Sequence, residues 1–253
     1  IGVHFGKPLP KTTTAPQLKQ VVSQLSVSAW QDYVKNHSQI AIEWLHQVKQ
    51  NPNQWSLVEN TGKKLSAKET LIATLAVAHT LHYDIKDDAP VGILLPTSIG
   101  GSIANMAVLS QGKTVVNINF TSPVHVVEKC VKSAKITTVI TAQKFLDKLA
   151  SKGIDFAPLL ADKHVILIEE ILGKLGLSKK VLLWLATTLL PTTILERLFF
   201  KGVDLEQTAA ILFSSGSEGT PKGVCLSHAN LLANIKQTTS IVNPEANDVV
   251  LNS

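Results

Sequence analysis

Between residues 91 and 168, short runs of consecutive apolar residues alternate with segments whose apolar residues recur at helical spacing. The apolar runs cover residues 91–95, 114–118, 137–141 and 165–168, and the helical segments cover residues 98–110, 123–133 and 143–151. A strand that is apolar on consecutive residues is typical of a parallel sheet covered on both faces. Strands that alternate with helices through short loops require crossover connections. The sequence therefore predicts the α/β class, with a mostly parallel sheet and flanking helices.

The segments on either side of this alternating core are less regular. Residues 1–15 contain a short apolar alternation and then prolines, which favour an edge strand that runs into a loop. Further segments are predicted as two helices within residues 18–49, a strand at 55–59, a helix at 67–81 and a final strand at 248–253. Ser66 and Glu69 form the capping box of the helix at 67–81. Because neither end shows a signal peptide or a capping element, we expect an excised piece with an incomplete sheet.

A glycine- and serine-rich segment, residues 214–223, follows a predicted strand at 209–213 and precedes a strand at 224–226 and a helix at 228–241. Three glycines allow positive φ and a close approach of backbone N–H groups to a ligand; they are Gly216, Gly219 and Gly223. Four residues supply hydroxyl donors; they are Ser214, Ser215, Ser217 and Thr220. Lys222 adds a mobile positive charge. Such donors at the carboxyl edge of a parallel sheet predict an anion site for phosphate.

Several function classes conflict with the sequence. The P-loop spacing G-x-x-x-x-G-K-S/T is absent, because the residue five after Gly216 is Pro221, and there is no G-x-G-x-x-G dinucleotide fingerprint. The formal net charge is +5, but Arg197 is the only arginine, so recognition of bases by several arginines is excluded. His125 and His164 have no second ligand at metal-binding spacing. We therefore expect no nucleic acid partner and no metal site built from protein residues alone.

Residues 214–223 resemble the phosphate-binding signature of the AMP-forming adenylating superfamily, which includes acyl-CoA synthetases, luciferases and the adenylation domains of peptide synthetases. The signature is Ser/Thr-Ser/Thr-Gly-Ser/Thr-Ser/Thr-Gly-x-Pro-Lys-Gly, and nine of the ten positions comply. The departure is Glu218, where Ser or Thr is usual. A carboxylate beside a triphosphate is repulsive unless it faces a metal or the solvent.

This resemblance implies ATP and Mg²⁺ as cofactors, with the magnesium bound to the nucleotide. It implies that eight residues contact the nucleotide: Ser214, Ser215, Gly216, Ser217, Glu218, Gly219, Thr220 and Lys222. Lys222 is also implied as the catalytic residue, because its charge would offset the negative charge that develops as pyrophosphate leaves.

The resemblance extends over most of the chain. Residues 51–253 are similar to the amino-terminal part of an AMP-binding acyl ligase domain, and residues 1–50 to the tail of a glycerolipid acyltransferase domain followed by linker helices. Glu218 and the start of the helix after the loop resemble a family of bacterial bifunctional 2-acylglycerophosphoethanolamine acyltransferase/acyl-acyl carrier protein synthetases. This resemblance implies a fatty acid, acyl carrier protein and a lysophospholipid or membrane surface as partners. It also implies location at the cytoplasmic face of the bacterial inner membrane.

Two other functions fit the same residues. An acyl-CoA synthetase would transfer the acyl group to CoA in place of acyl carrier protein. A catalytically dead module that binds acyl groups or lipids would keep the fold without ligase activity. Binding of nucleotide and the identity of the acyl product distinguish the three hypotheses.

Residues 174–200 form an unusual apolar segment with several lysines at its start. Pro191 and Glu196 interrupt the apolar run too early for a membrane span, which needs about 20 apolar residues. The segment is predicted either as a helical hairpin packed on the sheet or as an element that lies at an anionic lipid surface.

Three further features are assigned structural roles. His79 and Asp84 have the His-x4-Asp spacing of an acyltransferase dyad, but they fall at the end of a predicted helix within the ligase-like part. His228 is predicted to pack or cap at a helix start, where the helix dipole lowers its basicity. Cys130 and Cys225 are predicted as reduced core residues.

Overall fold

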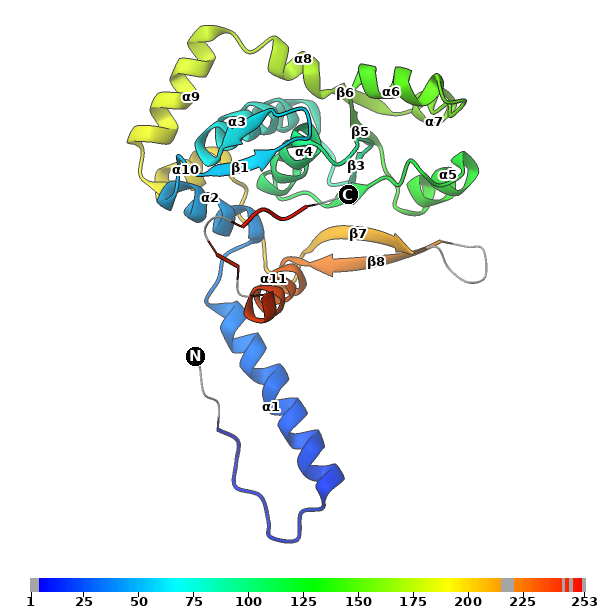
Figure 1. The fold of residues 1–253 in the computed structure, drawn as a ribbon. Coiled ribbons are helices and arrows are strands. Elements are labelled where there is room, and N and C mark those ends of the chain that lie inside the picture. The colour runs from blue at the N-terminus through cyan, green and yellow to red at the C-terminus, as the bar shows by residue number, and fades with distance from the viewer. Residues whose placement is uncertain (1–4, 215–220, 243, 246–247, 252–253) are drawn as a thin grey trace.

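The computed structural model describes residues 5–214, 221–242, 244–245 and 248–251. The described strands are β1 (Trp55–Val58), β2 (Lys64–Ser66), β3 (Val91–Ile93), β4 (Val115–Asn117), β5 (Thr138–Thr141), β6 (His164–Leu167), β7 (Thr208–Ser214) and β8 (Lys222–Ser227). Six of them form one sheet in the order β6-β5-β3-β4-β7-β8, and β1 pairs with β2 (Figure 1). Neighbours from β6 to β7 run parallel, and β8 is antiparallel to β7. The predicted α/β class and mostly parallel sheet are confirmed.

The helices fill the segments between these strands and the two ends of the chain. They are α1 (Ala15–Lys35), α2 (Ile40–Gln50), α3 (Ala67–Asp84), α4 (Ile99–Ser110), α5 (Val124–Ser133), α6 (Gln143–Ala150), α7 (Ala157–Leu160), α8 (Ile168–Gly173), α9 (Leu177–Leu189), α10 (Thr192–Phe199) and α11 (His228–Val242). None of the described helices is long and apolar enough to cross a membrane.

Helices cover both faces of the central sheet. Because neighbouring residues of a strand point to opposite faces, each strand contributes side chains to both covered faces. Val91, Val115 and Ile140 belong to an apolar core that also contains buried residues of α2, α3 and α4. Val116 and Val139, the neighbours of two of these residues, belong to a second core with residues of α5, α6 and α7. This burial on both faces explains why the strands are apolar without alternation.

Two helices begin with side chains that satisfy backbone N–H groups. Ser66 and Glu69 form the predicted capping box of α3, in which the Ser66 N–H donates to Glu69 Oε2 at 2.8 Å. At the start of α4, the Gly101 N–H donates to Ser98 Oγ at 3.1 Å. Glu59 reaches from the β1–β2 turn to the same helix, where its Oε1 accepts from the Ile99 N–H at 2.8 Å. These caps fix two helix starts at the carboxyl edge of the sheet.

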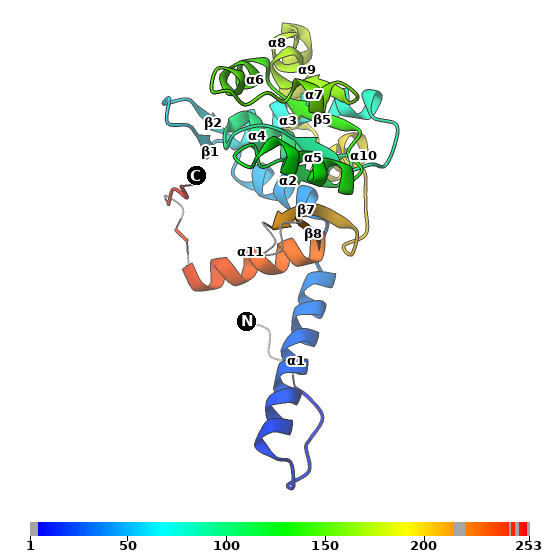
Figure 2. The same cartoon turned by 90° about the vertical axis from the view of Figure 1, so that its right-hand side faces the viewer.

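The two helices predicted within residues 18–49 are confirmed as α1 and α2. α1 projects away from the body and touches α11 at its carboxyl-terminal end (Figures 1 and 2). There the Trp30 and Tyr33 rings lie edge to face, 5.7 Å between centroids, and Lys236 Nζ of α11 lies 5.6 Å from the Tyr33 ring centroid.

The irregular segment at residues 5–14 agrees with the loop predicted around Pro8 and Pro10, which lack the N–H groups that a strand needs. The edge strand predicted before it falls mainly on residues 1–4, which lie outside the described residues. The strand predicted at 248–253 is wrong within the described residues, because residues 248–251 are irregular. Their apolar side chains are exposed, and the segment pairs with no described strand.

The two helices predicted within residues 174–200 are present as α9 and α10, but the predicted packing of a hairpin on the sheet is wrong, because α9 packs on α3 and α10 on α2 and α3. α8 and α9 form an arch over α3, and α9 contacts mainly α3, which already covers that face of the sheet (Figure 1). Lys49 Nζ of α2 donates to the Thr187 and Leu190 carbonyl groups at 2.8 and 3.0 Å. Since the last carbonyl groups of a helix lack partners within the helix, this lysine secures the end of α9.

Candidate functional site

The β7–β8 hairpin carries two of the predicted site residues on its two arms. β7 pairs with β4 only at Ala210, so beyond that residue the hairpin leaves the sheet and extends from the body (Figure 1). Ser214 and Lys222 are the last described cross-strand pair before the loop. The Ser214 hydroxyl donates a long hydrogen bond, 3.5 Å, to the backbone carbonyl of Lys222. Both residues are exposed, so the hydroxyl and the ammonium group are available to a ligand.

The other predicted nucleotide contacts lie outside the described residues. They are Ser215, Gly216, Ser217, Glu218, Gly219 and Thr220. Their roles stay predictions, as do those of Ser214 and Lys222. The hairpin nevertheless brings the two ends of this loop together, because antiparallel pairing sets Ser214 opposite Lys222.

Gly223 has a different role from the one expected. It pairs with Phe213 across the hairpin and is not among the described residues with positive φ. A Cβ atom at this position would lie 3.1 Å from Phe213 Cε1 and 3.2 Å from Ile211 Cγ2. The glycine therefore makes room for the Phe213 ring across the hairpin, and the prediction of positive φ at Gly223 was wrong.

A cavity of about 300 Å³ lies beside the start and end of the loop. Its walls come from the carboxyl end of β4, from α5 and from the hairpin, where Ser214 and Pro221 line it. Most of its lining is apolar, for example Ile118, Val127 and Phe213. The arrangement can accommodate an apolar group next to the exposed hydroxyl of Ser214 and ammonium group of Lys222.

Two asparagines that the sequence reasoning missed line this cavity. Asn117 ends β4 and exchanges side-chain amide hydrogen bonds with Asn105 of α4, at 3.0 and 3.1 Å. Asn119 Oδ1 accepts from the Thr121 N–H at 3.0 Å, which holds its side chain in a turn. The sequence pattern that could have identified Asn117 and Asn119 is a pair of polar residues at alternate positions, directly after the apolar run of β4.

The two cysteines differ in their surroundings. Cys130 lines the cavity and is partly buried, and burial raises the pKa of its thiol. A raised pKa keeps the thiol protonated, so Cys130 is not an activated nucleophile. Cys225 is exposed on β8, because the hairpin extends past the sheet, and its prediction as a core residue was wrong. Both cysteines are free, as predicted.

His228 begins α11 and is almost completely buried, with 1% of its surface exposed. Its Nδ1 accepts from the Ile40 N–H at 3.4 Å, which places the histidine between α11 and the start of α2. Burial lowers the pKa of His228, so desolvation, rather than the predicted helix dipole, is the cause. The Ser227 N–H donates to Asn230 Oδ1 at 3.0 Å and the Asn230 N–H to Ser227 Oγ at 3.2 Å, which caps α11. The predicted packing role of His228 agrees with this geometry.

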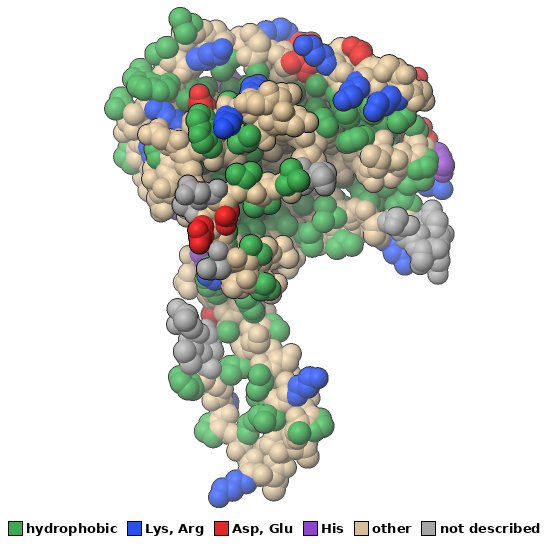
Figure 3. Space-filling view, viewed as in Figure 1, with side chains coloured by type: hydrophobic (Ala, Val, Ile, Leu, Met, Phe, Trp, Pro, Cys, Tyr) green, Lys and Arg blue, Asp and Glu red, His purple; other side chains and the backbone are tan. Residues whose placement is uncertain are grey.

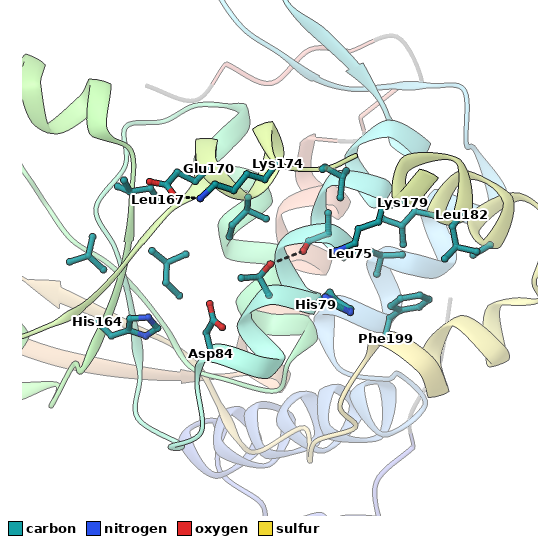
Figure 4. Close-up of a pocket in the computed structure, with 18 residues that line it drawn as sticks. Leu75, His79, Asp84, His164, Leu167, Glu170, Lys174, Lys179, Leu182 and Phe199 are labelled. Atoms are coloured by element: carbon teal, nitrogen blue, oxygen red, sulfur yellow. Dashed lines mark hydrogen bonds and ion pairs between the residues drawn. The ribbon is translucent and has the colours of Figure 1, made fainter. Parts of the chain in front are cut away.

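His79 and Asp84 lie at the end of α3 and line a separate cavity of about 500 Å³ (Figure 4). No hydrogen bond or ion pair joins these two described residues, and the His79 ring instead packs against Tyr83, 5.0 Å between centroids. A dyad requires the carboxylate to hold the imidazole through a hydrogen bond. The geometry therefore gives no support to a catalytic dyad at this position.

Within the ranges that the structure covers, no group of three or more His, Cys, Asp and Glu side chains could hold a metal ion. The donors at the hairpin, a hydroxyl and an ammonium group, suit the oxygen atoms of a phosphate. An ammonium group cannot coordinate a cation. These donors therefore fit the phosphates of a nucleotide better than a magnesium ion held by the protein.

The fold and the hairpin together define a class of α/β protein with a mostly parallel sheet and an antiparallel hairpin whose two arms flank a glycine-rich sequence. The profile described as "AMP-binding enzyme" matches residues 44–253, which is most of the chain. The chain therefore belongs to the AMP-binding enzyme family. The predicted fold, an amino-terminal subdomain of an adenylate-forming enzyme, is confirmed.

Individual relatives are similar over part of their length. The chain is 29% identical over 175 residues to 4-coumarate–CoA ligase-like 2 of Arabidopsis thaliana, over 68% of this chain and 30% of that protein. It is 47% identical over 49 residues to the chloroplastic long-chain-fatty-acid–acyl-carrier-protein ligase AEE15 of the same plant, 19% of this chain and 7% of that protein. The chain thus spans less than a third of the length of either relative.

The fold is similar to that of O-succinylbenzoate CoA synthetase (MenE) from Bacillus subtilis, which was solved with ATP and a magnesium ion. The TM-score is 0.61 with 16% sequence identity, over 80% of this chain and 47% of that chain. At this identity the likeness concerns the fold alone.

Proposed function

We propose that the chain supplies the phosphate-binding part of an AMP-forming ligase that activates a fatty acid with ATP. The observation that carries this proposal is the β7–β8 hairpin, which holds the Ser214 hydroxyl and the Lys222 ammonium group at the two ends of the signature loop. Membership in the AMP-binding enzyme family supports ATP as the substrate. The apolar cavity beside the loop provides space for a group that is not phosphate.

In this reaction a carboxylate oxygen of the fatty acid attacks the α-phosphorus of ATP. A bond from oxygen to phosphorus forms, and the bond from the α-phosphorus to the leaving pyrophosphate breaks, which gives acyl-AMP. Lys222 would offset the charge that develops on the leaving phosphates, and Ser214 would donate to a phosphate oxygen. Magnesium, bound to the nucleotide, would neutralise part of the same charge.

The acceptor is proposed to be the phosphopantetheine thiol of acyl carrier protein. Its sulfur would form a thioester with the acyl carbon, and AMP would leave. The support is the stretch that is 47% identical to a fatty acid–acyl carrier protein ligase. The rival is CoA, supported by the longer similarity to a plant CoA ligase-like protein.

We further propose that the acyl group passes on to a lysophospholipid and that residues 1–50 are the tail of an acyltransferase domain. In this proposal the enzyme acts at the cytoplasmic face of a bacterial inner membrane. The support for a membrane location is the apolar surface of α9. Leu177, Leu185 and Leu189 are exposed on this helix, and hydrophobic side chains cluster in this region of the surface (Figure 3). Exposed apolar patches of this kind suit a lipid surface.

One experiment separates these possibilities. The full-length protein is incubated with ATP, palmitate and either acyl carrier protein or CoA, and the products are identified by mass spectrometry. Palmitoyl-acyl carrier protein supports the proposal, and palmitoyl-CoA alone favours the rival. A separate titration measures ATP binding by the same protein. If no thioester and no acyl-AMP form, and the titration also shows no ATP binding, the chain belongs to a catalytically dead module.

A further inference from the structure

A third cavity, of about 650 Å³, lies between the β1–β2 turn, the outer face of α3 and the arch formed by α8 and α9. Neither Ser214 nor Lys222 lines it, so it is separate from the candidate site. It opens at the carboxyl edge of the sheet, because Ile99, Ala142 and Ile168, which follow β3, β5 and β6, all line it. Open α/β sheets commonly bind ligands at this edge.

The lining of this cavity is mainly apolar. Ile72 and Ala73 of α3 form one wall, and Val181 and Trp184 of α9 form the wall opposite. Lys68 Nζ lies 4.1 Å from the Trp184 ring centroid, and this cation–π contact fixes the indole against α3. The volume lies within the range of pockets that enclose small organic ligands.

The acidic and basic side chains at the rim of this cavity differ in whether they already have partners within the protein. Three carboxylates accept backbone N–H groups at helix starts: Glu59 at α4, Glu69 at α3 and Glu169 at α6. Only Oε1 of Glu169 makes such a bond, and its Oε2 is buried with no hydrogen-bond partner among the described residues. The positive end of each helix dipole offsets part of their charge. Three exposed lysines also line the rim, Lys63, Lys144 and Lys180. Among the described residues these lysines have no ion-pair partner.

We propose that this cavity binds a lipid with a single acyl chain and an anionic head group. The apolar walls take the acyl chain, and the three rim lysines attract the carboxylate or phosphate of the head group. A free fatty acid and a lysophospholipid share this chemistry. The site does not depend on the proposed ligase function, because it uses no residue of the phosphate loop.

The cavity drawn in Figure 4 provides the comparison. It lies on the other flank of α3 beneath the same arch, and Leu175 lines both cavities. There, Lys174 Nζ is paired with Glu170 Oε2 at 2.6 Å, and Lys179 shares the rim with Asp84. Its rim thus has fewer available positive charges. Lys179 and Lys180 are neighbours on α9 that line different cavities, which makes Lys179 a matched control.

The test is a titration of the full chain, without ATP, with palmitate and separately with 1-palmitoyl-lysophosphatidate, both kept below micelle-forming concentrations. Calorimetry gives the stoichiometry and affinity. The variants are the double change Lys144→Glu/Lys180→Glu, the filling change Ala73→Phe, and the control Lys179→Glu. Circular dichroism verifies that each variant is folded, and the double change alters only exposed side chains.

We expect at least one lipid to bind with a stoichiometry of one to one, and the tighter of the two identifies the head group. The double change should weaken binding by about tenfold or more, because two charge-assisted contacts are reversed. Ala73→Phe should also weaken binding, and Lys179→Glu should leave it within about twofold. Absence of binding by both lipids overturns the proposal. So does equal weakening by Lys179→Glu and the double change.

Discussion

Lys222 is the residue on which the proposed chemistry depends most directly. It is exposed at the start of β8, opposite Ser214, and its flexible side chain can follow a phosphate group that moves away during reaction. The backbone of Lys222 is held by strand pairing, and its ammonium group is at the end of a flexible side chain. The remaining predicted donors fall on residues 215–220, which lie outside the described residues, so their roles stay predictions.

Replacing Lys222 by Ala should lower the rate of acyl-AMP formation by a factor of about 10 to 1000, because a charge partner of the leaving phosphates is removed. The measurement is palmitate-dependent exchange of pyrophosphate into ATP by the full-length protein. Lys148→Ala, an exposed change on α6, is the matched control. Exchange within twofold of the parent rate in the Lys222 variant would remove this lysine from the mechanism.

Glu218 gives a second test in the same assay. Glu218→Thr restores the residue that is usual in the signature, so exchange should stay within about threefold if the carboxylate faces solvent or metal and makes no phosphate contact. Loss of most of the exchange activity would instead assign Glu218 a role of its own in the reaction.

His228 links proton binding to the stability of the fold. Its pKa is lowered in the folded state by burial, so the unfolded chain binds the proton more tightly. Above pH 6.5, the ordinary pKa of histidine, the buried neutral imidazole makes its full contribution to the free energy of unfolding. This contribution is lost as the pH falls from 6.5 toward the lowered pKa of the folded state. Below pH 6.5 the free energy of unfolding should decrease by up to about 1.4 kcal/mol per pH unit through this one group.

Urea denaturation at pH 7.5 and pH 5.5 measures this effect. The parent chain should lose more stability between the two values than His228→Gln, because glutamine does not titrate in this range. His125→Gln, on the surface of α5, is the control and should keep the parent's pH dependence. Identical pH dependence in the parent and the His228 variant would show that burial of His228 carries no proton linkage.

At the scale of the helices and strands, the sequence predicted the central sheet well because each strand is apolar on consecutive residues and each helix is periodic. It missed α7 and α8, which are too short to show a periodic pattern. It also misplaced Cys225 and assigned positive φ to Gly223, because local pattern does not reveal that the hairpin leaves the sheet after Ala210. Packing of α9 and α10 on α3 depends on which helix already covers the sheet, and that is a tertiary property.

The exposed side of α9 gives a prediction for this element. Leu185→Asp combined with Leu189→Asp should reduce sedimentation of the protein with anionic vesicles severalfold, because charged side chains oppose insertion at the lipid interface. Both leucines are exposed, at 40% and 72%, so the fold should be retained. Thr188→Asp, on the same helix, controls for added charge. Unchanged sedimentation of the double variant would argue against lipid contact by α9, and unfolding would show that these side chains are needed for packing.

At the scale of the whole molecule, the chain spans about 30% of the length of the plant ligase-like protein that it resembles. The two described residues of the proposed phosphate site, Ser214 and Lys222, are exposed on a hairpin that extends from the body. Each hydrogen bond at such a position contributes about 0.5 to 1.5 kcal/mol, and that gain is opposed by the entropy lost when a ligand is immobilised.

The 253-residue chain by itself should therefore bind ATP with a dissociation constant in the millimolar range or weaker, and should release pyrophosphate at least about tenfold more slowly than the full-length protein. Calorimetry with magnesium–ATP measures the affinity, and a coupled pyrophosphate assay measures the rate. The Lys222→Ala form of the same chain is the control, since weak binding through the loop should fall further without this charge. Micromolar binding, or a rate within tenfold of the full-length protein, would mean that these residues already contain a complete nucleotide site, and the hairpin would then have to act with side chains of the body such as Asn117 and Asn119.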